Sequence, residues 1–101
     1  MRYMVSASIV VIIACLTIAT CYALSAEDNG YAWNSADMSA RVAICKNFAS
    51  KVGYDYMWWL ENINSAYDTT EPAALKWPIK EVATYCAMMR YTLEQYEKNH
   101  Q

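Results

Sequence analysis

The stretch LKWPIKEVATYCAMMRYTLEQY, residues 75–96, carries the clearest pattern in the chain. Its apolar side chains recur at alternating steps of four and three residues, at Leu75, Ile79, Val82, Cys86, Met89, Leu93 and Tyr96. This spacing predicts a helix that is packed along its length against other helices. Since Pro78 cannot continue a helix that begins before it, we expect a kink or a new start there, and a helix that runs on to about Lys98. This row of apolar side chains, the seam of the helix, would also suit a second copy of the chain, so a homodimer is a further expectation.

Shorter stripes of the same kind precede this segment. The first predicts a helix from Ser35 to Val52, with apolar positions at Met38, Val42, Cys45, Ala49 and Val52. Gly53 follows it as a stop signal, because glycine adopts the left-handed conformation at a helix end without a Cβ clash. A second helix is expected from Asp55 to Tyr67, with one face formed by Tyr56, Leu60, Ile63 and Tyr67.

The remaining segments are less regular. Pro72 is suited to a first helical turn, so a short helix is expected from there to Trp77. Residues 27–34 show no period and are expected to form an extended or loosely ordered arm. No strand-like alternation or internal repeat is present. The sequence therefore predicts an all-α fold, a compact bundle of three to four short helices, over residues 27–101.

Length and composition limit the classes of function. A chain of 101 residues holds one domain at most, and 56% apolar against 18% charged residues favours a folded chain over a disordered one. The net charge is −2 and no basic block occurs, so nucleic acid is not an expected partner.

The N-terminus reads as a targeting segment. Residues 3–26 contain no charged side chain, and they are preceded by Arg2 and followed by Glu27 and Asp28. We interpret residues 1–26 as a signal peptide cleaved after Ser25 or Ala26. An uncleaved anchor and a lipoprotein are the alternatives, and membrane contact is expected only if the segment is retained. All three place residues 27–101 outside the cytoplasm, in the periplasm or secreted.

The cysteine count agrees with export. Cys15 and Cys21 would leave with the signal peptide, so the mature chain keeps Cys45 and Cys86. Two cysteines in a short exported domain predict one disulfide. It would close a loop of roughly 40 residues, for which the chain-entropy model gives about 4 kcal/mol of stabilisation.

Residue types that carry catalysis are scarce. The one histidine is the penultimate residue, His100, and no glycine-rich loop precedes a helix. Both retained cysteines are assigned to the disulfide, and no spacing of a known metal site appears. We therefore expect a protein that is not an enzyme and has no metal or cofactor.

Aromatic residues are abundant, and most are expected in the core. Four fall outside the apolar stripes or before the first helix, namely Trp58, Trp33, Tyr31 and Tyr91. Exposed tryptophan and tyrosine are common anchors of protein interfaces, so these four are the candidate partner-binding residues.

In architecture, residues 27–101 resemble small periplasmic proteins in which one disulfide joins separate helices, here through Cys45 and Cys86. Two such families are the immunity proteins that neutralise type VI secretion amidases and the acid-stress chaperones of the periplasm. The resemblance implies either an inhibitor of another protein or a chaperone that exposes apolar surface on partial unfolding.

The leading hypothesis is an exported, non-enzymatic module that binds a protein partner outside the cytoplasm, in the manner of an inhibitor or immunity protein. A periplasmic stress chaperone is the first alternative. A carrier of apolar ligands is the second, and it requires an internal cavity.

Overall fold

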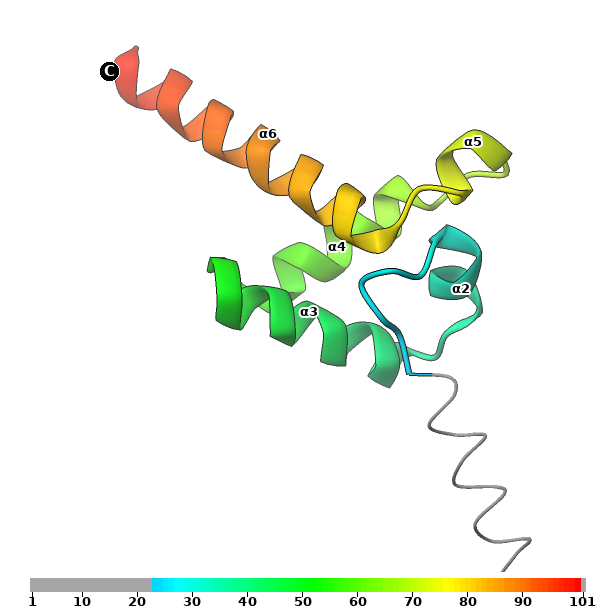
Figure 1. Cartoon of the computed structure of the whole chain (residues 1–101). Helices are drawn as coiled ribbons and strands as arrows, with labels where there is room; N and C mark the ends of the chain where they lie inside the picture. The colour runs from blue at the N-terminus through cyan, green and yellow to red at the C-terminus, as the bar shows by residue number, and fades with distance from the viewer. Residues whose placement is uncertain (1–22, 101) are drawn as a thin grey trace, which may run out of the picture.

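A computed structural model describes residues 23–100, and the predictions for residues 1–22 lie outside this range. The described residues form helices and no strand, which confirms the all-α prediction (Figure 1). Five helices follow one another, of which two are short: α2 (Gly30–Ser35), α3 (Met38–Val52), α4 (Tyr56–Ala66), α5 (Pro72–Leu75) and α6 (Ile79–Asn99).

The ends of α3 and α4 are fixed by side-chain caps. The Asp37 carboxylate accepts a hydrogen bond from the Ala40 amide at 2.9 Å, and this bond lowers the pKa of Asp37. Asp55 caps α4 in the same way through the Met57 amide at 3.2 Å. Gly53 ends α3 with φ of 105°, as the sequence predicts. The start of α3 lies three residues beyond the predicted one, because residues 30–35 form a helix of their own.

This additional helix, α2, corrects the expectation of a loosely ordered arm at residues 27–34. The Asn29 side chain accepts from the Ala32 amide at 3.2 Å and so caps the helix. Arg41 on α3 then holds its C-terminal end, donating from Nε to the Trp33 carbonyl at 3.0 Å and from Nη2 to the Asn34 carbonyl at 3.1 Å. A helix of six residues is too short to show periodicity, so the sequence pattern missed it.

The core is centred on α4, which packs against both α3 and α6. Its three buried side chains, Trp59, Leu60 and Ile63, lie on the face that the sequence predicts. The whole buried set is Trp33, Ile44, Cys45, Trp59, Leu60, Ile63, Tyr67, Leu75, Ile79, Val82 and Ala83. The predicted α3 stripe is correct only in its middle, since Met38 and Val52 at its ends are exposed.

Tyr67 joins three of the helices. It is the C-cap residue of α4, and its buried phenol donates to the Trp77 carbonyl after α5 at 2.6 Å. Burial is the main cause that raises the pKa of Tyr67 to about 12, and negative charge at Cys86 and Glu81 adds to it. The phenol therefore keeps its proton and remains a hydrogen-bond donor. Its ring lies directly against the backbone of Gly30, at the first turn of α2.

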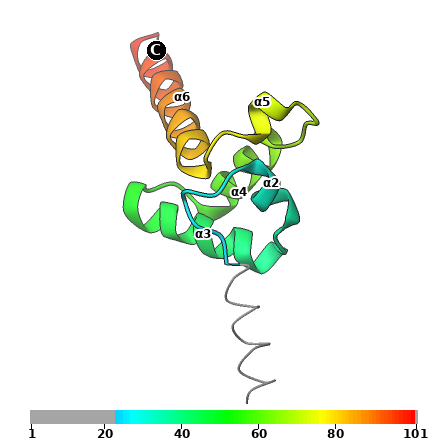
Figure 2. The same cartoon turned by 45° about the vertical axis from the view of Figure 1, so that its right-hand side comes forward.

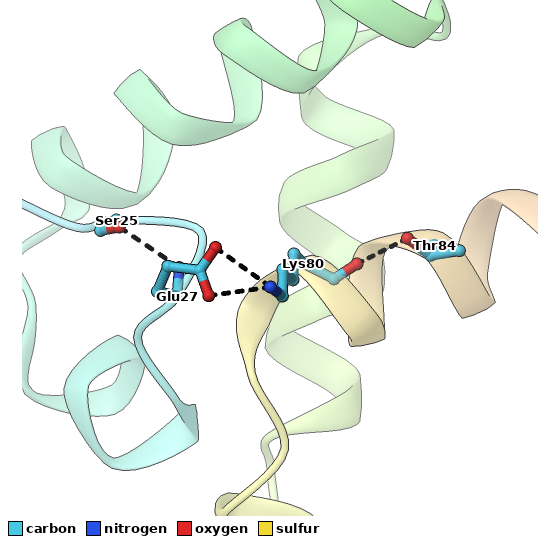
Figure 3. Close-up of polar contacts among 4 residues, drawn as sticks. All are labelled: Ser25, Glu27, Lys80 and Thr84. Carbon is cyan, nitrogen blue, oxygen red and sulfur yellow. Dashed lines mark hydrogen bonds and ion pairs between the residues drawn. The ribbon is translucent and has the colours of Figure 1, made fainter.

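Residues 24–29 lead into α2 and at the same time hold the start of α6. The Ile79 amide donates to the Asp28 carbonyl at 2.7 Å, and the Lys80 amide donates to the Ala26 carbonyl at 2.9 Å. Figure 3 shows the side-chain contacts beside these bonds, including the ion pair of Lys80 Nζ with Glu27 Oε2 at 2.8 Å. Leu24 also packs against the core, so the folded unit includes residues on the N-terminal side of the expected boundary at residue 27.

The C-terminal half of α6 leaves the rest of the fold. Both views show it projecting away from α3 and α4 (Figures 1 and 2). Ile79 and Val82 are buried and Cys86 is partly buried, but Met89, Leu93 and Tyr96 are exposed. The prediction of a helix packed along its whole length is therefore wrong for this half, because no other described helix covers its apolar side chains.

Replacement of Gly30 by alanine should destabilise the fold. A Cβ at this position would overlap the Tyr67 ring, which is buried and held by its hydrogen bond to Trp77. Overpacking of this kind costs about 1–3 kcal/mol, whereas an alanine for a glycine in an open helix adds up to about 1 kcal/mol of stability. Chemical denaturation of Gly30→Ala measures which effect dominates.

Ser35→Ala is the matched control, because Ser35 is exposed on the same helix. Its free energy of unfolding should change by less than about 0.5 kcal/mol. A Gly30→Ala protein as stable as the parent would show that α2 does not lie against Tyr67.

Candidate partner-binding groove between α4 and α6

Trp58 lies on the flank of α4 that faces α6. It is half-buried, with its ring centroid 5.0 Å from that of Tyr54 and 4.9 Å from that of Trp59. Tyr54 has a φ of 67°, an uncommon conformation for a bulky residue. The Tyr54 ring forms one cluster with the two tryptophans, and its centroid is 6.1 Å from that of Trp59.

Arg90 connects this cluster to α6. Its guanidinium carbon lies 4.0 Å from the centroid of the Tyr54 ring and 4.8 Å from that of Trp58. Its Nε also donates to Glu94 Oε1 at 3.0 Å. A guanidinium held over two aromatic faces is a favourable cation–π arrangement, and it fixes the Trp58 ring in one position.

Between these elements runs a groove with a volume of about 610 Å³. Its lining combines apolar side chains with a polar end: Trp58, Asn62, Tyr85, Cys86, Met89, Arg90, Leu93, Glu94 and Glu97. A second hollow of about 320 Å³ shares Tyr85 and Cys86 with it and is otherwise formed by Ala66, Ala73, Ala74, Trp77 and Val82. The two hollows are neighbours along α6 and are largely apolar, so they suit apolar side chains of another molecule.

Trp33 is not part of this surface, and the expectation that it is exposed is wrong. Its side chain has no exposed area. The indole Nε1 donates to Asn64 Oδ1 at 2.9 Å, and the Arg41 guanidinium lies 5.6 Å from the ring centroid. Trp33 is buried because residues 30–35 form a helix that presses it against α4, whereas the sequence pattern placed it in an arm.

Tyr31 and Tyr91 are exposed, as expected, but they do not meet Trp58 in one patch. Tyr31 belongs to α2, away from the groove. Tyr91 lies two residues from both Met89 and Leu93, and at 100° per residue this places it on the opposite side of α6. Of the four predicted residues, only Trp58 lines the groove.

The sequence pattern missed the groove residues Met89 and Leu93 because it assigned them to a buried seam. A comparison of helix lengths would have identified Met89 and Leu93 as exposed. At 1.5 Å per residue, the 21 residues of α6 extend for about 31 Å, whereas the 11 residues of α4 extend for about 16 Å. A helix of that length leaves part of a longer stripe uncovered.

Cys45 and Cys86 are both free thiols in the structure, so the predicted disulfide is not confirmed. Cys45 is fully buried on α3, and burial raises its pKa to about 11. Burial also raises the pKa of Cys86, which lines the groove. Neither thiol is therefore activated as a nucleophile.

Other features of the described residues add no chemistry to the groove. Within residues 23–100, three or more metal-ligating side chains do not gather at any point. None of the helices in this range has the length and apolarity needed to cross a membrane.

Comparison of the chain with protein-family models, curated proteins and solved structures gives no match.

The two thiols should differ in reactivity in the folded, reduced protein. With a pKa near 11, only about one Cys45 thiol in a thousand is ionised at pH 8, and the side chain is inaccessible. Iodoacetamide should therefore label Cys86 at least about tenfold faster than Cys45. Peptide mass spectrometry of timed samples reads both rates.

The same labelling in denaturant is the control, and the two rates should then be similar. Equal rates in the folded protein would contradict the burial of Cys45.

Proposed function

We propose that the protein is an exported, non-enzymatic binding module that captures a protein partner outside the cytoplasm, in the manner of an inhibitor or immunity protein. Its binding site is the groove between α4 and α6. The observation that carries this proposal is the position of Trp58, a half-buried aromatic side chain held rigidly beside exposed apolar residues.

Rigidity of this kind favours binding. The Trp58 ring is confined by Tyr54, Trp59 and Arg90, so little side-chain entropy is lost when a partner covers it. Tryptophan in a partly desolvated pocket is also the residue type most often found as an energetic centre of an interface. Met89 and Leu93 supply the apolar surface around it.

The polar end of the groove favours a partner with basic side chains. Glu94 and Glu97 both line it, and Arg90 is engaged by Glu94 and the aromatic rings. Glu97 forms no ion pair with another described residue. The preferred partner surface is therefore apolar in its centre with a lysine or arginine at its edge.

Affinity measurements on a captured partner test this assignment. The exported protein is used to isolate a stoichiometric partner from the envelope of its native host, and the dissociation constant is then measured for each variant. Trp58→Ala should weaken binding by about 30-fold, since truncation of a central aromatic costs about 2 kcal/mol.

Tyr91→Ala is the control, because it removes an exposed aromatic from the opposite side of the same helix. It should change affinity by less than about twofold. Equal affinity for the parent and Trp58→Ala, with both folded by circular dichroism, would exclude the groove as the binding site.

Export and a Cys45–Cys86 disulfide belong to the same proposal. The apolar segment at residues 1–26 supports export, and the presence of two cysteines in the mature chain supports the bond. Because burial raises the pKa of both thiols, oxidation would take place before folding is complete rather than in the native state.

We expect the exported protein to show no free thiol after denaturation. Peptide mapping should yield a Cys45–Cys86 linked pair, and reduction should lower the free energy of unfolding by about 4 kcal/mol, the value for a loop of this length. Two titratable thiols per chain in the freshly exported, unfolded protein would refute the disulfide while leaving the groove proposal intact.

A further inference from the structure

The exposed half of α6 continues the stripe that the other half buries. Met89, Leu93 and Tyr96 keep the same four-and-three spacing as Ile79, Val82 and Cys86, but they are 56%, 56% and 59% exposed. Both views show this part of the helix standing clear of the other elements (Figures 1 and 2). An apolar seam of this spacing is the pattern by which one helix packs against another.

We propose that the protein forms a symmetric dimer in which the C-terminal halves of two α6 helices pack antiparallel. This inference goes beyond the proposed function, because it needs no second kind of protein. The two share a surface, since Met89, Leu93 and Glu97 also line the groove. The occupant of the seam is another copy of this chain, and the two folded bodies lie at opposite ends of the helix pair.

The charged residues on one side of the seam favour the antiparallel arrangement of the two helices. Arg90 and Glu97 are seven residues apart and lie on the same side of α6. When two such helices run antiparallel about a two-fold axis between Leu93 and Tyr96, Arg90 of each copy faces Glu97 of the other. Leu93 of each copy then packs against Tyr96 of the other, so the contact is self-complementary.

A parallel pair lacks this match. In a parallel arrangement Glu97 of one copy would face Thr92 of the other, and Arg90 would face Tyr85, so no ion pair would form across the seam. The opposite flank of the antiparallel pair carries the uncharged Thr92 and Asn99, so no like charges meet there. Charge complementarity therefore specifies both the partner and its direction.

The surface available is sufficient for a reversible dimer. Three side chains that are more than half exposed, with the stems of the polar residues beside them, offer an interface at the small end of the range, which is typical of weak, reversible contacts. Monomer and dimer should thus exchange with concentration. Only the Arg90 side chain has to turn, from Glu94 and the Tyr54 and Trp58 rings toward Glu97 of the other copy.

Sedimentation velocity of the exported protein over a series of concentrations tests the proposal. The mass should rise from one chain to two as concentration increases. Leu93→Glu should remain a single chain throughout, because it places a carboxylate at the centre of the seam. Since Leu93 is exposed in the single chain, circular dichroism of this variant should be unchanged.

Charge reversal tests the direction of the helices. Glu97→Arg should weaken the dimer by about tenfold, because it brings Arg90 of one copy against an arginine of the other. Arg90→Glu combined with Glu97→Arg should restore the dissociation constant to within about threefold of the parent value. Tyr91→Glu, on the outer side of α6, is the control and should leave the dimer unchanged.

Three results would overturn the proposal: a single-chain mass at every concentration, a dimer that Leu93→Glu does not affect, or a folded double variant as weak as Glu97→Arg. Trp58→Ala separates this proposal from the proposed function, because Trp58 lies on α4 and contacts the seam residues only through Arg90. It should reduce capture of a partner protein and leave the dimer in place.

Discussion

Two backbone hydrogen bonds at the start of α6 determine where the longest helix of the protein is attached. Pro78 has no amide hydrogen and offers no side-chain cap, so the amides of Ile79 and Lys80 need acceptors from elsewhere. The carbonyls of Asp28 and Ala26 supply them. Because Ile79 is fully buried, water cannot replace the acceptor of its amide, and leaving that amide unsatisfied would cost about 1–3 kcal/mol. The direction of α6 follows from this attachment, and with it the division into a packed half and a projecting half.

These bonds are an example of a feature that the sequence does not reveal, in contrast to the helices themselves. The stripes of α3, α4 and α6 appear directly in the sequence, because helices bury apolar side chains at a regular spacing. Backbone bonds between distant segments leave no such trace, since any residue supplies the same carbonyl. The residues before α2 therefore looked like a loose arm, although Asp28 and Ala26 hold α6. Trp33 was misplaced for a related reason, because the six residues of α2 are too few to reveal a period.

The candidate site was predictable to a smaller extent. Spacing identifies which side of a helix is apolar, and on that basis Trp58 was correctly separated from Leu60 and Ile63. The spacing does not identify which other part of the protein, if any, covers the apolar side of a helix. Met89 and Leu93 share the spacing of Val82, yet only Val82 is buried. Similarly, Arg90 lies over the ring of Tyr54, a residue with a left-handed backbone, and no sequence pattern predicts that geometry.

A single stripe that is buried at one end and exposed at the other has a consequence for binding. Val82 and Ile79 fix the helix in the core, so Met89 and Leu93 are already ordered before any partner arrives. A partner that covers them pays no cost for folding a segment, which is the usual penalty for exposed apolar sequence that binds. The same rigidity prevents the fold from hiding these side chains by local rearrangement. An apolar surface of this kind is typical of an interface, either with a second copy or with a partner protein.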